Sequence, residues 1–127
     1  MTWRNPLDAL PATAKSRLLK RAPPTWVSPM LATLTDERFS REGWLFEPKL
    51  DGERCLAFCH GRELRLLSRN RKRLNEKYPE ITEAFRQQEI DTFIADGEIV
   101  AFKDGITSFA KLQQRMQIKR PSVELLR

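Results

Sequence analysis

Long apolar runs are missing from this sequence. Apolar runs such as 93–95 and 99–102 fall far short of the ~20 residues that a membrane-spanning helix requires. Residues 1–6 include no apolar segment of the kind found in secretory signals, so we expect no signal peptide. We therefore predict a cytoplasmic protein without a membrane partner.

Cysteine is scarce as well. The chain has two, Cys55 and Cys59, four positions apart in a segment that we expect to be a strand. At ~3.3 Å per residue their Cα atoms would lie ~13 Å apart, which is too far for a disulfide. We predict two free thiols in a reducing compartment, because unpaired cysteines are often buried. A metal site formed with His60 is the alternative, and the same separation argues against it.

Repeats and low-complexity tracts are absent, and the composition is that of a folded protein. The 127 residues are 40% apolar and 31% charged, which excludes wholesale disorder and allows one domain, or part of one, to form a core. Lys and Arg number 23 against 17 Asp and Glu, a net charge of +6 that indicates an anionic partner.

Much of the positive charge gathers in one stretch of twelve residues. Such a run is either a solvated basic loop or a contact for the phosphates of a nucleic acid. The charge alone leaves both interpretations open. Its members are Arg62, Arg65, Arg69, Arg71, Lys72 and Arg73.

Strand signals begin near residue 43. A turn at 61–62 would join two of the strands into a hairpin, and a turn at 103–105 would end the strongest one. A proline makes the first strand an edge or a strand end. The expected strands are 44–48, 54–60, 63–68 and 92–102.

Helix signals lie between and around these strands. Apolar residues at spacings of three and four predict a helix over 75–88, and Ser108 is placed to cap another helix that follows it. Prolines make 22–29 an extended linker. Further helical segments are expected at 14–21, at 35–39 as one turn, and from 121 onward.

Lys49 is the first residue that could carry chemistry. It would stand at the end of strand 44–48, before an Asp51-Gly52 turn and close to Arg54. A neighbouring cation lowers the pKa of a lysine, and a neutral amine can attack an α-phosphate to give a phosphoramidate. An ordinary charged hairpin turn is the alternative.

Asp96 and Glu98 are the second candidates. Alternation along a strand places both carboxylates on one face, where they could accept ribose hydroxyls or help to hold Mg²⁺, or could simply face solvent. Arg69, which leaves strand 63–68, is well placed to bind a phosphate through its forked guanidinium.

These segments resemble the motifs of a known enzyme family. Residues 49–54, Lys-Leu-Asp-Gly-Glu-Arg, resemble motif I of the covalent nucleotidyltransferases, which include ATP-dependent DNA ligases, RNA ligases and mRNA capping enzymes. Residues 68–70 and 96–98 resemble motifs Ia and III in the expected order. The flanks 29–32 and 108–115 resemble bacterial DNA ligases of the ligase D type, which act in non-homologous end joining.

The resemblance implies a role for each matching residue. Lys49 would be adenylated with ATP as cofactor and Mg²⁺, or Mn²⁺, as metal. Glu47 would offer its carbonyl to adenine, Leu50 would belong to the nucleotide pocket, and Glu98 would bind ribose or the metal. Arg54 and Arg69 would contact ribose or phosphate. The implied DNA contacts are Arg54, Arg69, Arg71, Lys72 and Arg73.

The resemblance also implies a fold and its partners. We expect an α+β, ATP-grasp-like nucleotidyltransferase fold of antiparallel sheets with flanking helices. Residues 1–28 would be an extension and linker, and 29–127 the N-terminal part of a ligase adenylation domain, ending before motifs IIIa, IV and V. The partners would be nicked or broken duplex DNA in the nucleoid, and the remaining half of the ligase or an end-joining protein.

Three hypotheses follow. The first is a DNA ligase fragment that is weak or inactive alone, with apolar surface exposed where the rest of the domain would pack. The second is a non-catalytic remnant that binds DNA through its basic residues. The third is an RNA ligase or capping-type relative, against which the ligase D-like flanks argue.

Overall fold

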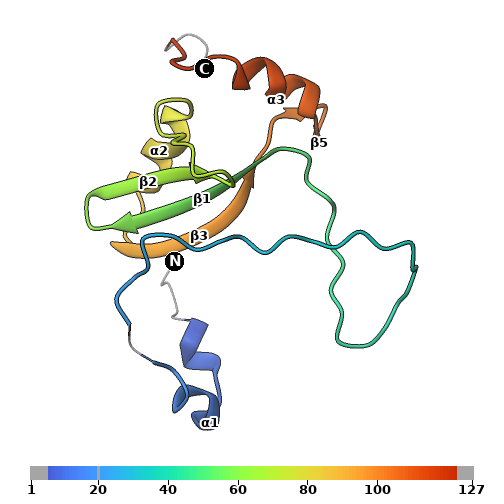
Figure 1. Cartoon of the computed structure of the whole chain (residues 1–127), viewed down its shortest axis with the longest axis vertical. Helices are drawn as coiled ribbons and strands as arrows, with labels where there is room; N and C mark the ends of the chain where they lie inside the picture. Colours follow the sequence, from blue (N-terminus) through green and yellow to red (C-terminus); the bar gives the residue numbers. More distant parts are fainter. Residues whose placement is uncertain (1–5, 20, 123–127) are drawn as a thin grey trace.

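The computed structural model describes residues 6–19 and 21–122. At its centre is a three-stranded antiparallel sheet with the order β2-β1-β3 (Figure 1). The strands are β1 (Glu53–His60), β2 (Glu63–Ser68) and β3 (Thr92–Ile99). Together with its helices, this sheet places the protein in the predicted α+β class.

The β1–β2 hairpin is the most local part of the sheet. Gly61 has a left-handed φ of 58°, which glycine adopts without steric cost, and the turn sets Cys59 opposite Leu64. β3 then adds to the other edge of β1, with Arg54 opposite Glu98. The two hairpin strands are confirmed almost residue for residue.

The strand predicted over 92–102 is interrupted. β3 ends at Ile99, and a separate two-stranded hairpin follows, made of β4 (Phe102–Lys103) and β5 (Ile106–Thr107). Its turn residues Asp104 and Gly105 both have positive φ, which confirms the predicted turn at 103–105.

One face of the sheet packs against α2 (Pro79–Arg86) and α3 (Phe109–Met116). Ser108 caps α3, as predicted, because its hydroxyl accepts a hydrogen bond from the backbone N–H of Lys111. The buried cluster between these layers is Cys55, Ala57, Leu64, Leu66, Leu74, Tyr78, Ile99 and Leu112.

The helix predicted over 75–88 begins four residues late, at Pro79. The side chain of Asn75 accepts from the backbone N–H of Leu66 and donates to the carbonyl of Leu64, both at 3.0 Å. The amide therefore continues the hydrogen-bond ladder of β2. Asparagine side chains that pair with backbone in this way compete with helix formation.

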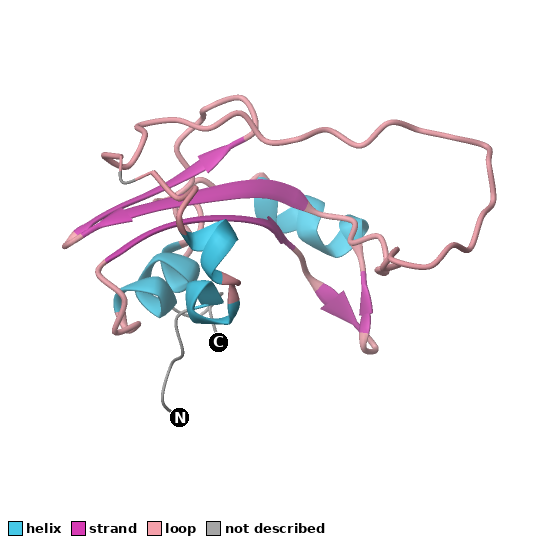
Figure 2. Ribbon diagram, turned by 90° about the horizontal axis from the view of Figure 1, so that it is seen from below, coloured by secondary structure: helices cyan, strands magenta, loops and turns pink. Residues whose placement is uncertain are grey.

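The opposite face of the sheet is covered by the extended segment 22–30. Trp26 stacks on Phe58 of β1 with ring centroids 6.0 Å apart, and Leu56 and Phe58 are both buried although they point away from the helices. Figure 2 shows this loop on the upper side of the strands and helices on the lower side. The predicted linker thus forms part of the packed structure.

The N-terminal helix differs from its prediction. A 3₁₀ turn, η1 (Pro6–Ala9), precedes a short α1 (Ala12–Lys15), whereas we expected a helix over 14–21. Leu18 and Leu19 remain exposed, so no apolar packing supports a longer helix. Among the described residues, no helix is long and apolar enough to cross a membrane.

Residues 31–52 form a long loop that projects from the body (Figure 1). The helical turn predicted at 35–39 and the edge strand predicted at 44–48 are both wrong. A strand needs a neighbour, and within the described chain none pairs with 44–48. Phe39 packs instead against Trp44 and Phe46, with ring centroids 4.8 and 5.8 Å away.

Candidate functional site

Arg54 and Asp96 form a short ion pair on the sheet. Nε and Nη2 of Arg54 each donate to one carboxylate oxygen of Asp96 at 2.5 Å, and Nη2 also reaches the carbonyl of Met30 at 3.4 Å. These hydrogen bonds raise the pKa of Arg54 and lower the pKa of Asp96. The pair is a charge-assisted, bidentate link between β1 and β3.

Glu98 lies beside this pair, at the end of the sheet where the long loop enters β1. It stands opposite Arg54 in the register, and its charge also raises the pKa of Arg54. As predicted, β3 places Asp96 and Glu98 at alternate positions of one strand. The end of the sheet therefore brings together two carboxylates and one guanidinium.

Gly52 connects the loop to the sheet for a steric reason. A Cβ at this position would lie 2.1 Å from the carbonyl oxygen of Ile99 and 2.9 Å from Cγ of Glu98. The sequence predicted a turn at Asp51-Gly52, but the φ of Gly52 is not left-handed. Glycine is required here because two backbones approach closely. The approach fixes residue 52 against the carboxylate-bearing end of β3.

Lys49 lies three residues before this contact point, in the loop. Its side chain is 87% exposed, and its ammonium group lies 3.7 Å from the carboxylate of Asp51. The strand end that we expected to present it is absent, because 44–48 is loop. No contact between described residues joins Lys49 to Arg54, Arg69 or Glu98. Glu47 and Leu50 lie in the same exposed loop.

The basic run is divided by β2 into separate groups. Arg62 lies at the β1–β2 turn, and Arg65 points from β2 toward the linker, where its guanidinium lies 5.3 Å from the Phe58 ring and donates to the carbonyl of Thr25. At ~3.3 Å per residue, the six residues of β2 separate the two ends of the run by roughly 17–20 Å. The members beyond β2 are Arg69, Arg71, Lys72 and Arg73.

These last four cations form an ordered loop. Ser68 accepts from the backbone N–H of Arg71 and its own N–H donates to the carbonyl of Lys72, both at 2.9 Å. Arg71 has a positive φ of 61°, and its guanidinium lies 4.8 Å from the ring centroid of Trp26. Arg71 is therefore occupied by a cation–π contact, whereas Arg69, Lys72 and Arg73 are exposed without a recorded acidic partner in the described chain.

Glu53 is a structural residue that the sequence interpretation missed. Its carboxylate accepts from the hydroxyl of Tyr78 at 2.6 Å and pairs with Lys77 at 2.9 Å, on the helix side of the sheet. The pKa of Tyr78 is raised, mainly because the hydroxyl is buried and to a smaller extent because it donates a hydrogen bond to Glu53. The alternation of a strand could have found this role, because it puts Glu53 and Arg54 on opposite faces.

Both thiols are free, as predicted. Burial raises the pKa of the Cys55 thiol to about 11. Cys59 is only half-buried, and it donates weakly to the carbonyls of Gly61 and Asp91. In the part of the chain that the structure describes, no three His, Cys, Asp or Glu side chains gather as a metal site.

Comparison with known sequences decides the family. The sequence model described as ATP dependent DNA ligase domain matches residues 29–126, far more than half of the chain. The chain belongs to this family. The resemblance to ATP-dependent DNA ligases is therefore confirmed over the region that contains Lys49, Arg54, Arg69 and Glu98.

Individual relatives agree with this assignment. DNA ligase C1 of Mycolicibacterium smegmatis is 39% identical over 79 residues, which is 61% of this chain and 23% of that protein. DNA ligase C2 of the same organism is 35% identical over 100 residues, or 79% of this chain and 28% of that protein. LigD of Pseudomonas aeruginosa, named a multifunctional non-homologous end joining protein, is 32% identical over 95 residues. That is 74% of this chain and 11% of that protein.

The chain thus matches between 11% and 28% of the length of these relatives. No solved structure is significantly similar to it.

Proposed function

We propose that this chain is the lysine-bearing part of an ATP-dependent DNA ligase with a nucleotidyltransferase fold. The observation that carries the proposal is the contact of Gly52 with Ile99 and Glu98. This contact anchors the Lys49 loop to the end of the sheet where Arg54 of β1 pairs with Asp96 of β3. A guanidinium and two carboxylates at one sheet end, next to a loop that carries a lysine, suit nucleotide chemistry.

In the proposed reaction Nζ of Lys49 gives up its proton and attacks the α-phosphorus of ATP. A nitrogen–phosphorus bond forms as the bond to the β-phosphate oxygen breaks and pyrophosphate leaves. An oxygen of a DNA 5′-phosphate then displaces the lysine, and a 3′-hydroxyl displaces AMP to seal the strand. Arg54 and Arg69 would bind phosphate or ribose oxygens, with the carbonyl of Glu47 on adenine and Leu50 against the nucleotide.

Glu98 is the residue that fits a divalent cation best. Its oxygens are the hard ligands that Mg²⁺ and Mn²⁺ prefer, and unlike Asp96 it has no ion pair recorded in the described chain. Such a cation would neutralise part of the triphosphate charge. The same carboxylate could instead accept ribose hydroxyls.

We expect little or no sealing by this chain alone. Lys49 is 87% exposed to solvent and paired with Asp51, so nothing in the loop holds its amine against a phosphate. The apolar side chains of the loop are uncovered, which fits packing against the remaining portion of a ligase catalytic domain. That portion, or an end-joining protein, is the partner that we propose.

Labelling with α-³²P-ATP and Mg²⁺ tests the proposal. We expect weak label on the chain alone and strong label when the rest of the domain is supplied by the corresponding part of DNA ligase C1. Lys49→Ala should abolish the label, while Lys103→Ala, which changes another exposed lysine in β4, should keep it. Label that survives Lys49→Ala would contradict the role of Lys49, and strong label on the chain alone would contradict the need for a partner.

A second candidate is a non-catalytic DNA-binding function, and the exposed cations Arg69, Lys72 and Arg73 favour it. It predicts duplex binding that weakens with salt and persists in Lys49→Ala, because these cations contact phosphates and not the nucleotide. Loss of binding in that variant would refute it. Competition between nicked DNA and RNA separates both candidates from an RNA ligase or capping function.

A further inference from the structure

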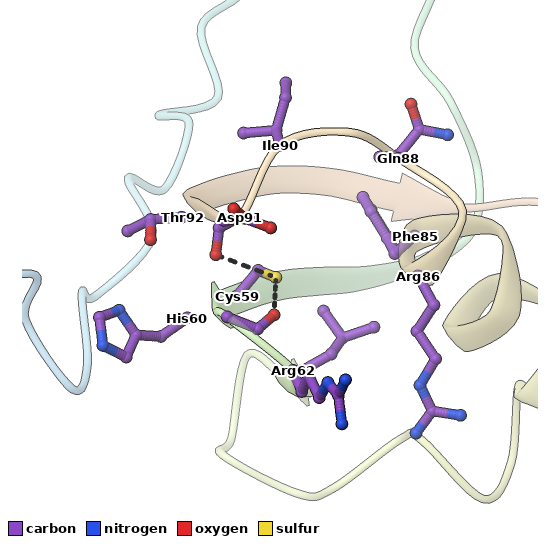
Figure 3. A pocket seen from close by; sticks show the side chains of 11 residues that line it. Cys59, His60, Arg62, Phe85, Arg86, Gln88, Ile90, Asp91 and Thr92 are labelled. Carbon is purple, nitrogen blue, oxygen red and sulfur yellow. Dashed lines mark hydrogen bonds between the residues drawn. The ribbon is translucent and has the colours of Figure 1, made fainter.

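We propose that the cavity between the β1–β2 turn and the α2–β3 loop binds a phosphate group, a function beyond the ligase chemistry proposed above. The cavity has a volume of about 750 Å³ and is shown in Figure 3. Ligand sites of nucleotide-sized molecules commonly have this size. Its walls come from the two loops, the end of α2 and the last residues of β1.

Two arginines from different elements line this cavity. Arg62 comes from the hairpin turn and Arg86 from the last turn of α2, and Figure 3 shows both side chains extending to the same side. Arg62 has no ion-pair partner among the described residues, and Arg86 lies only within 4.0 Å of Glu83, an exposed contact that stabilises little. Both guanidiniums are therefore available to a ligand.

The cavity is held in shape by bonds between its two loops. The backbone N–H of Gly61 donates to the carbonyl of Asp91 at 2.7 Å. The thiol of Cys59 lies 3.6 Å from the carbonyl of Gly61 and 3.7 Å from that of Asp91, as the dashed lines of Figure 3 show. A pocket already ordered before binding loses less entropy when a ligand enters.

The composition of the walls selects the ligand chemistry. One guanidinium can satisfy both oxygens of a carboxylate, whereas a phosphate presents further oxygens that a second guanidinium can bind from another direction. Leu64 and Phe85 supply apolar wall that suits a sugar or base. Asp91 is the single carboxylate of the lining and leaves a net positive charge there.

This site is separate from the one that holds Lys49. Gly52 and Glu98 lie at one end of β1, and His60 and Thr92 lie at the other. Seven residue steps at ~3.3 Å make the distance roughly 23 Å. The phosphate could belong to a free nucleotide or to the backbone of a nucleic acid strand, and the test below separates the two sources.

Cys59 provides a reporter inside the cavity, since Cys55 is buried and its reactivity should stay low. The rate of Cys59 alkylation is measured by mass spectrometry with 5′-AMP, with pyrophosphate and with a short DNA duplex. At about ten times the Kd, mass action predicts a roughly tenfold slower reaction. Protection by AMP identifies a nucleotide site, and protection by the duplex alone identifies a strand contact; either supports the proposal.

Arg62→Gln and Arg86→Gln, singly and together, should remove the protection, while Arg38→Gln in the long loop should keep it. Lys49→Ala should also keep the protection of Cys59. Failure of the phosphate-site proposal is therefore distinguishable from failure of the ligase proposal. Circular dichroism verifies that each variant is folded. Absence of protection by all three probes, or protection that persists in the folded double variant, would overturn the proposal.

Discussion

At the scale of single residues, Gly52 is the position in segment 49–54 where a side chain has no room. Its backbone lies against the carbonyl of Ile99, so any side chain must displace a strand end and not merely another side chain. The neighbouring glycine of β3, Gly97, has open space around it and no left-handed φ. The two positions therefore form a matched pair for a test.

We expect Gly52→Ala to destabilise the protein by about 1–3 kcal/mol, the usual range for overpacking. Gly97→Ala should change the free energy of unfolding by far less. Urea denaturation measures both values. Equal effects of the two substitutions would show that the contact with Ile99 does not limit residue 52.

The Arg54–Asp96 pair makes a second prediction at this scale. The pKa of Asp96 is lowered in the folded state, so the stability it contributes is present above the ordinary carboxyl pKa of about 3.9 and is lost as pH falls through the lower folded value. Because both side chains are more than a third exposed to solvent, we expect less than about 1 kcal/mol.

Asp96→Asn should remove this part of the pH dependence. The measurement is the urea midpoint of both proteins between neutral and strongly acidic pH. Asp36→Asn, in the exposed loop, is the control and should leave the curve unchanged. An Asp96→Asn curve parallel to that of the unchanged protein would contradict the assignment.

At the scale of elements, the linker and the sheet depend on each other. Trp26 covers Phe58 and lies under the guanidinium of Arg71, so one side chain joins the linker, β1 and the loop after β2. Trp44 makes a comparable aromatic contact within the long loop but is 59% exposed.

We expect Trp26→Ala to cost about 3 kcal/mol, the lower end for a buried tryptophan, since Trp26 is only partly buried. Trp44→Ala should cost much less. Thermal and urea unfolding check both. If Trp44→Ala lowered the free energy of unfolding more than Trp26→Ala does, the long loop, and not the linker, would support the sheet.

Some features of these elements could be predicted from the sequence and others could not. The hairpin, the turn at 103–105 and the cap at Ser108 were predictable because their signals are local. The pairing of Arg54 with Asp96 was not, because it joins residues 42 positions apart and depends on which strand adds to β1. The late start of α2 could not be predicted either, since the Asn75 side chain serves β2. The role of Lys49 stays a prediction.

At the scale of the whole molecule, charge and apolar surface are distributed unequally. Residues 31–52 contain five acidic and three basic side chains, whereas the whole chain has a net charge of +6. The same loop exposes Leu34 at 95% and Leu45 at 91%. An apolar and acidic arm on a basic body favours association with other chains.

We therefore expect the isolated chain to self-associate as its concentration rises. Leu34→Gln together with Leu45→Gln should lower the weight-average mass in sedimentation equilibrium, while Leu7→Gln, an exposed leucine outside the loop, should not. A mass that is independent of concentration in the unchanged protein would contradict this expectation.

The two outer edges of the central sheet differ. The outer edge of β2 is already occupied, because its backbone groups form hydrogen bonds with Lys72, Leu74 and Asn75. Arg73 also forms an isolated β-bridge with Leu67. In the described chain no strand pairs with the outer edge of β3. The sheet can therefore grow in one direction only, and a strand added there would lie alongside Asp96 and Glu98.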